Sequence, residues 1–320
     1  MLLEAVCMKK EEFYFDSGKY KLHGVRYTPD EGQEVRCVLQ IVHGMAEYVE
    51  RYEEFASFLT EKGFVVTGED HLGHGKSVGK KGKQGYFCEQ DPATALVENV
   101  HRLRELTREL YKDVPYVVMG HSMGSFITRN YMFRHGKGLA GVVIMGTGME
   151  PLMTVRAAKA VTAVQKLFFG SRHTSRLVDR LAFGVYNKKI EHPRTDFDWL
   201  SRDESRVDQY MADSQCGFVF TVNGFEALFE LISRPYRREN LALIPKELPV
   251  YVVSGTADPV GGYGDGVKKA YRSLKEAGVK SVELKLYKGG RHELLNETNR
   301  DEVMKGICQW IETAVLRKKS

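Results

Sequence analysis

The chain contains little cysteine and no long apolar run. Only five of its 320 residues are cysteines, and they are scattered, odd in number and never spaced C-x-x-C, which favours reduced thiols over a disulfide framework or a zinc site. These are Cys7, Cys37, Cys88, Cys216 and Cys308. No stretch approaches the roughly 18 consecutive apolar residues of a membrane-spanning helix. Glu4 breaks the short apolar start, so we see no secretory signal and expect a cytoplasmic protein.

Charge of one sign is not concentrated anywhere except at the C-terminus. The formal net charge is +5, and the only cluster, Arg317-Lys318-Lys319, reads as a solvated tail, so nucleic-acid binding gains no support. We find no internal repeat and no low-complexity segment. A composition of 42% hydrophobic and 28% charged residues is ordinary for a globular protein with a large core. Nothing in the sequence indicates an oligomeric state.

Strand-like and helix-like segments alternate along most of the chain. A hairpin is predicted at residues 12–15 and 20–27, and buried strands at 35–42, 64–67, 116–119, 139–145, 249–253 and 282–287. Helices are predicted near residues 52–59, 93–111, 266–277 and 301–316, and directly after residue 122. This alternation indicates an α/β protein with a mostly parallel sheet and helices on both faces.

The alternation of strand-like and helix-like segments is interrupted between residues 146 and 240, where alanine-rich and aromatic helical stretches replace it. We interpret this segment as a helical cap inserted after the sixth strand, over the carboxyl ends of the strands, where ligands bind in such folds. The predicted domains are a core of residues 1–146 and 241–320 and a cap of residues 147–240.

The most informative stretch is residues 116–124, in which an apolar run meets G-x-S-x-G and a helix-forming segment follows at once. A nucleophilic serine needs this strand–turn–helix context, because the tight turn exposes its hydroxyl beside backbone N–H groups. Gly120 and Gly124 flank the turn, since a side chain there would collide with neighbouring backbone. Ser122 is therefore the candidate nucleophile.

A serine nucleophile requires a base, and the base requires an acid that holds its tautomer. In this type of fold the order along the chain is serine, acid, histidine. Asp258 and His292 each follow a predicted strand, in that order, so we expect the triad Ser122, Asp258 and His292. Asp265 is the weaker candidate for the acid, because it lies beyond the turn, in or near the next helix.

The oxygen of a tetrahedral intermediate needs two backbone donors. One is expected from Met123, directly after the nucleophile. The other is expected from Met45, in the loop after the strand at residues 35–42, where His43-Gly44 marks an abrupt strand exit. No metal or organic cofactor is required: Gly73–Ser77 lacks the first glycine of a phosphate-binding loop, and Asn296 replaces the second histidine of H-E-x-x-H.

With these residues in place, the chain resembles the monoacylglycerol lipase/lysophospholipase family of capped α/β-hydrolases. The similarity spans nearly the whole length and is densest in H-G-M-A-E-Y with R-Y-E-E-F-A (43–56), D-H-L-G-H-G-K-S (70–77), G-H-S-M-G (120–124) and G-G-R-H-E-L-L-N-E (289–297). The resemblance implies the same triad on Ser122, Asp258 and His292, with Met45 and Met123 as oxyanion donors. It also implies that D-H-L-G-H-G is a structural loop.

The expected function is hydrolysis of single-chain lipid esters, either monoacylglycerols or lysophospholipids, with transient contact between the cap and a membrane surface. A broad short-chain carboxylesterase or thioesterase, and a ligand receptor that keeps the triad with little turnover, remain alternatives. The resemblance implies that the cap binds the acyl chain, and the apolar face that carries Val161, Val164 and Phe168 is the candidate surface. The same stripe could equally pack on the core. Chain length and head group stay open.

Overall fold

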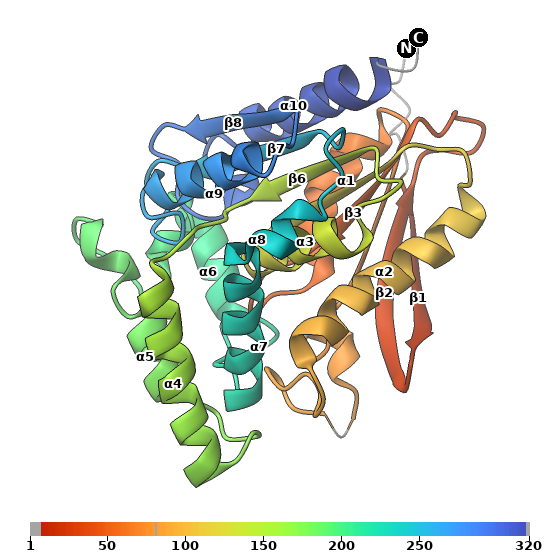
Figure 1. Ribbon diagram of the computed structural model, residues 1–320. Coiled ribbons are helices and arrows are strands. Elements are labelled where there is room, and N and C mark those ends of the chain that lie inside the picture. Colours follow the sequence, from red (N-terminus) through yellow and green to blue (C-terminus); the bar gives the residue numbers. More distant parts are fainter. Residues whose placement is uncertain (1–7, 81, 318–320) are drawn as a thin grey trace.

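The computed structural model describes residues 8–80 and 82–317, so Cys7, Lys318 and Lys319 lie outside the described part of the chain. Its centre is an eight-stranded sheet with the order β1-β2-β4-β3-β5-β6-β7-β8 (Figure 1). The strands are β1 (Lys9–Ser17), β2 (Tyr20–Thr28), β3 (Cys37–Val42), β4 (Phe64–Glu69), β5 (Tyr116–His121), β6 (Gly141–Met145), β7 (Val250–Gly255) and β8 (Val282–Tyr287). β2 pairs antiparallel with β1 and with β4. From β4 onwards, each neighbouring pair in the order β4-β3-β5-β6-β7-β8 is parallel.

Apolar strand sequences explain why the middle of the sheet is covered on both faces. Every residue of β3, β4, β5, β6 and β7 is buried, as expected for parallel strands between two helical layers. Successive side chains of β5 reach opposite layers: Val117 and Met119 join the core under α1 and α10, whereas Val118 joins the core under α2 and α3. This confirms the predicted mostly parallel sheet.

Five helices form the two layers of the core. They are α1 (Glu53–Thr60), α2 (Pro92–Leu110), α3 (Met123–His135), α9 (Asp265–Glu276) and α10 (Arg300–Ile311), the last of which continues into a π-helical turn (Glu312–Leu316). α1 and α10 pack on one face of the sheet, and α2, α3 and α9 pack on the other (Figure 1). The sheet register brings the strand ends to a common edge, because Val42 pairs with Gly120 and His121 pairs with Met145.

The segment between β6 and β7 is helical, as the sequence indicated. It contains α4 (Leu152–Phe169), α5 (Arg176–Phe183), α6 (Glu204–Ala212), α7 (Val222–Ser233) and α8 (Arg238–Ala242), with short 3₁₀ turns at Tyr186–Lys189 and Asp198–Leu200. α4 packs against α7, and α7 packs against α2 and α3, which connects the segment to the core. Among the described residues, no helix is both long and apolar enough to cross a membrane.

Candidate active site

Ser122 occupies the sharp turn between β5 and α3. Its backbone has φ 53° and ψ −121°, a conformation that costs a non-glycine residue energy and that recurs at functional sites. Two glycines make the turn feasible. A Cβ on Gly120 would lie 2.2 Å from the Gly124 carbonyl oxygen, and a Cβ on Gly124 would lie 1.9 Å from the Val42 oxygen. The predicted role of both glycines is confirmed.

Asp258 and His292 lie together at the carboxyl ends of β7 and β8. The His292 Nδ1 is 3.0 Å from the Asp258 Oδ1, and the carboxylate also accepts hydrogen bonds from the Ser254 hydroxyl and the Val260 N–H, both at 2.9 Å. Burial by itself raises the pKa of the Asp258 carboxyl, but the charge of His292 and these hydrogen bonds outweigh it and hold the pKa below its usual range. An ionised Asp258 favours the tautomer of His292 that carries its proton on Nδ1 and leaves a lone pair on Nε2.

Asp265, the weaker candidate for the acid, is not part of this group. It begins α9, its side chain is 81% exposed, and its nearest cation is the Lys268 ammonium at 3.4 Å. Asp258 is completely buried beside the histidine. The structure therefore brings only the first of the two candidate acids to the histidine.

The loop that follows β3 runs directly beside the serine. A Cβ on Gly44 would come within 3.1 Å of the Ser122 Cβ, so the backbone at Gly44 approaches Ser122 closely. Met45, the next residue, lines the same cavity as Ser122. Met123 is the first residue of α3, where backbone N–H groups have no partner within the helix and the helix dipole favours negative charge. Both predicted oxyanion residues therefore border the same cavity as Ser122.

A cavity of about 650 Å³ opens over the serine. Ser122, His292, Met45 and Met123 line its floor, and residues of the helical segment complete its walls. The His292 Nε2 is buried and has no hydrogen-bond partner among the residues that the structure describes. The predicted nucleophile, Ser122, and the predicted base, His292, therefore border the same space.

The apolar face of α4 does not form part of this cavity. Val161 is half-buried and packs against the core that includes α7, whereas Val164 and Phe168 are 56% and 73% exposed. None of the three is among the described residues that line the cavity. The apolar walls instead come from Phe183, Phe218, Val219, Leu228 and Ile232. Apolar residues at helical spacing indicate that a helix has an apolar face, but they do not indicate which neighbouring element covers that face.

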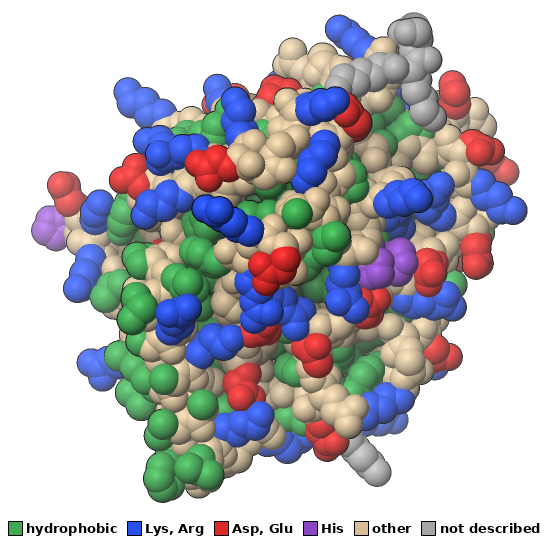
Figure 2. Space-filling view, viewed as in Figure 1, with side chains coloured by type: hydrophobic (Ala, Val, Ile, Leu, Met, Phe, Trp, Pro, Cys, Tyr) green, Lys and Arg blue, Asp and Glu red, His purple; other side chains and the backbone are tan. Residues whose placement is uncertain are grey.

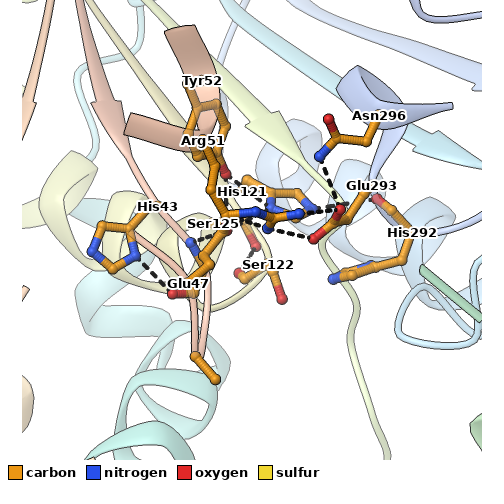
Figure 3. A network of polar contacts seen from close by, with 12 residues as sticks. His43, Glu47, Arg51, Tyr52, His121, Ser122, Ser125, His292, Glu293 and Asn296 are labelled. Carbon is orange, nitrogen blue, oxygen red and sulfur yellow. Dashed lines mark hydrogen bonds and ion pairs between the residues drawn. The ribbon is translucent and has the colours of Figure 1, made fainter. Parts of the chain in front are cut away.

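A buried ionic network lies behind the serine (Figure 3). Arg51 donates to both carboxylate oxygens of Glu293, at 2.7 and 2.8 Å, and to Glu47 at 2.8 Å. Glu47 in turn contacts the His121 Nδ1 at 3.1 Å and accepts from the Tyr52 hydroxyl at 2.9 Å. The network links three loops that carry predicted site residues: the one with Met45, the turn with Ser122, and the one with His292. No sequence-based prediction assigned it a role.

The charges in this network stabilise one another. Burial by itself raises the pKa of Glu47 and of Glu293, but His121 for the first and Arg51 for both outweigh it, so both values lie below the usual range. Burial alone lowers the pKa of His121, yet the hydrogen bond and charge of Glu47 raise it overall. A protonated His121 can donate from Nδ1 to Glu47 and from Nε2 to the His292 carbonyl oxygen, 3.3 Å away. Arg51 and Glu47 belong to the motif at residues 43–56, and this motif was the only indication in the sequence that the two residues have a structural role.

Among the described residues, one group of acidic and histidine side chains has the spacing of metal ligands: Glu12, His23 and Glu50. The Lys76 ammonium already contacts Glu12 at 2.5 Å and Glu50 at 3.0 Å, and His23 is hydrogen-bonded to the buried Asp70. Cationic and hydrogen-bonding partners therefore satisfy these ligand atoms. Glu12 lies on β1, His23 on β2 and Glu50 in the 3₁₀ turn Val49–Tyr52, and none of the three lines the cavity.

The mostly parallel sheet with helices on both faces defines an α/β-hydrolase, and comparisons with known proteins agree. A model of the family described as "Serine aminopeptidase, S33" matches residues 33–299 of this chain. The chain belongs to this α/β-hydrolase family and, within it, is similar to the monoacylglycerol lipases.

Three relatives illustrate the similarity. A monoacylglycerol lipase of Mycolicibacterium smegmatis is 28% identical over 89% of this chain and 90% of its own length. A monoglyceride lipase homolog of Monkeypox virus is 25% identical over 88% of this chain and 90% of its own length. The solved structure of a thermostable carboxyl esterase from Bacillus coagulans is 31% identical, covers 97% of this chain and 100% of its own, and superposes with a TM-score of 0.88.

Proposed function

We propose that this carboxylic ester hydrolase cleaves single-chain lipid esters, such as monoacylglycerols or lysophospholipids, through an acyl-enzyme on Ser122. The observation that carries the proposal is the shared cavity: Ser122 at its strained turn and the unpartnered Nε2 of His292 both border it. Asp258 holds the opposite side of the imidazole at 3.0 Å. This arrangement is the one that nucleophilic acyl transfer requires.

The residues would act in sequence. The Ser122 hydroxyl attacks the ester carbonyl while the His292 Nε2 takes its proton, and Asp258 stabilises the imidazolium that forms. The oxyanion is bound by the backbone N–H groups of Met45 and Met123. His292 then protonates the leaving alcohol, and a water molecule activated by the same imidazole hydrolyses the acyl-enzyme. Neither a metal nor an organic cofactor is required for these steps.

The nature of the cavity supports a lipid acyl chain. Its walls from the helical segment carry mainly aliphatic and aromatic side chains, with a few polar groups such as Asp179 and Asn187. A concave, mostly apolar site with a few polar groups suits an amphiphilic ester. The names of two relatives, a monoacylglycerol lipase and a monoglyceride lipase homolog, support the same substrate class. The carboxyl esterase neighbour supports a broad esterase as the second candidate.

We further propose that residues 147–240 form the cap of a core made of residues 1–146 and 241–320, and that the cap contacts lipid surfaces. Its outer face exposes a patch of apolar side chains, which Figure 2 shows over α4 and α5 among lysines and arginines. The cap patch consists of Met153, Val164, Leu167, Phe168, Phe169, Leu177 and Leu181, each more than half exposed. Exposed apolar side chains with basic side chains among them are typical of peripheral contact with a membrane.

We infer a cytoplasmic location from the thiols. Cys37, Cys88, Cys216 and Cys308 are buried and free among the described residues, and unpaired cysteines are usual where glutathione keeps thiols reduced. Fractionation of cells that express the native chain would test this location. Recovery in a secreted fraction would contradict it.

An ester panel tests the proposed reaction. Initial rates with acetyl to palmitoyl esters, monoacylglycerol and lysophosphatidylcholine should show a preference for long single-chain substrates. Ser122→Ala should lower kcat by roughly 10⁴ to 10⁶ and abolish labelling by a fluorophosphonate, with little change in the melting temperature. Labelling that persists in this variant would mean that another serine is the nucleophile. A preference for acetyl esters would favour the broad esterase, and a single turnover per protein would indicate a receptor.

A further inference from the structure

Part of the cap is joined directly to the loop that carries His292. The backbone N–H groups of His292 and Glu293 donate to the carbonyl oxygens of Trp199 and Leu200, at 3.3 and 2.7 Å. The Arg291 guanidinium donates to two further carbonyl oxygens of the same cap segment. Additional hydrogen bonds between residues 201–203 and 291–300 run from Ser201 to Asn296, from Arg202 to Glu297 and Asn299, and from Arg300 to Asp203. The cap segment at residues 198–203 and the histidine loop therefore hold one another in place.

This connection places an indole beside the imidazole. The ring of Trp199 is centred 5.2 Å from the ring of His292 at an angle of 41°. Tyr186, also from the cap, packs edge-on against Trp199 at 4.9 Å and 75°, which gives the indole a second aromatic contact. His292 is thus held at four points: its Nδ1 by Asp258, its ring by Trp199, its N–H by the Trp199 carbonyl and its own carbonyl oxygen by His121.

Aromatic side chains attract cations through the negative charge on their faces, and tryptophan does so most strongly. During the proposed reaction the imidazole of His292 alternates between a neutral base and an imidazolium. The Trp199 indole therefore interacts more favourably with the state that forms as Ser122 attacks. An interaction that is stronger in the transition state than in the ground state raises kcat rather than substrate affinity.

We propose that Trp199 is a positioning residue for the general base: it fixes the orientation of the His292 ring and favours its imidazolium form. This inference rests on the proposed function, because it takes His292 to be the base. It assigns to a residue of the cap a role that is exerted through His292. Among the described residues, Asp258 and His121 contact the His292 side of this ring pair, Tyr186 contacts Trp199, and Glu293 follows His292 on the same loop.

The substitutions Trp199→Leu and Trp199→Phe test the proposal with an acetyl ester that does not reach the far walls of the cavity. Trp199→Leu should lower kcat about 3- to 10-fold and leave KM within roughly twofold, and it should move the acidic limb of the kcat/KM profile to lower pH by roughly 0.4 to 1 unit. Trp199→Phe should retain most of both properties. Trp310→Phe and Trp310→Leu are the matched controls, since Trp310 packs on Tyr251 and hydrogen-bonds Glu283, away from the cavity. They should leave the acidic limb in place.

An NMR titration of the His292 ring proton, assigned with His292→Ala, measures the same effect without any substrate. Its midpoint should move to lower pH in Trp199→Leu and change little in Trp310→Leu. Trp199 also lines the cavity, and an unmoved midpoint, or a loss confined to KM, would overturn the proposal and leave it with that role alone. If the parent protein neither hydrolyses esters nor reacts with a fluorophosphonate, the proposed function fails. The role of Trp199 in favouring the imidazolium is then still decided by the NMR midpoint.

Discussion

The His121 Nε2 lies 3.3 Å from the carbonyl oxygen of His292, so the residue before the proposed nucleophile supports the backbone of the proposed base. The rings of the two histidines are centred 4.8 Å apart. Gly146, directly after β6, leaves room for both, because a Cβ there would come within 3.1 Å of each ring. The spacing between Ser122 and His292 therefore depends on contacts between the residues at the ends of β5, β6 and β8. The predictions below follow from these contacts.

The identity of the acid is tested by a pair of substitutions. Asp258→Asn should reduce kcat by about 10⁴, because the neutral amide no longer holds the correct tautomer of His292. Asp265→Asn should be nearly silent, since its side chain is exposed at the start of α9. Steady-state rates with one short ester and one long ester measure both. A larger loss from Asp265→Asn would reverse the assignment.

Met45 is expected to act through its backbone. Met45→Ala should change kcat only mildly, whereas replacement of the backbone amide at this position by an ester should cost about 10² to 10³, the usual effect of losing one oxyanion donor. Semisynthesis of the two forms and single-turnover rates make the comparison. If the alanine change is equally harmful, the side chain shapes the cavity that it lines and the donor lies elsewhere.

Arg51 should contribute strongly to stability. Its removal leaves the carboxylates of Glu47 and Glu293, only 5% and 6% exposed, without their cation, and breaking a buried pair in this way costs about 3–5 kcal/mol. Arg36→Ala is the control, because its ion pair with Glu312 is 43% and 33% exposed and should be worth roughly 0–1 kcal/mol. Urea unfolding of Arg51→Ala and Arg36→Ala gives both values. Equal effects would show that the buried network adds no more than a surface pair.

The same network predicts how stability depends on pH. Glu47 and Glu293 have lowered pKa values in the folded state, so their contribution is present above the unfolded value of about 4.3 and disappears as the pH falls through the folded values. The pKa of His121 is raised, so its contribution is complete below about 6.5 and disappears as the pH rises through the folded value. The difference in melting temperature between the parent and His121→Gln should therefore be largest near pH 6 and shrink towards pH 9. A constant difference would mean that His121 stays neutral.

The cap patch should govern lipid binding. Leu167→Ser with Phe168→Ser removes two side chains that are 81% and 73% exposed, and each could contribute about 1.5–3 kcal/mol when buried in lipid. Cosedimentation with phosphatidylcholine/phosphatidylserine vesicles should weaken at least tenfold, while the rate with a dissolved acetyl ester should stay within about twofold. Leu110→Ser, at the end of α2 and 59% exposed, is the control. Equal vesicle binding by all three proteins would exclude the patch.

Much of the catalytic arrangement could be predicted because its signals are local. The apolar run into G-x-S-x-G specifies strand, turn and helix within ten residues, and the structure has them as β5, Ser122 and α3. The strand ends that carry Asp258 and His292 were equally visible, since buried parallel strands have continuous apolar sequences. Two strands begin about two residues later than predicted, because the apolar sequence starts before the strand pairing does. β3 begins at Cys37 instead of residue 35, and β6 begins at Gly141 instead of residue 139.

The apolar face of α4 shows a limit of prediction from sequence patterns. Periodicity could identify an apolar face, but Val155 is buried while Val164 and Phe168 are exposed on the same helix. Which side of a helix meets a cavity depends on how α4 packs on α7. That packing is a property of the assembled cap and not of the helix.

The sequence by itself determined the α/β-hydrolase architecture and the order of the proposed nucleophile, acid and base, because strand patterning and turn chemistry act between near neighbours. Only the tertiary structure decided what supports these residues. Arg51 meets Glu293 across 242 positions, and Trp199 reaches His292 from the cap. Single charged or aromatic residues in loops have no periodicity to predict their partners, and the order of the strands in the sheet brings these loops to one edge.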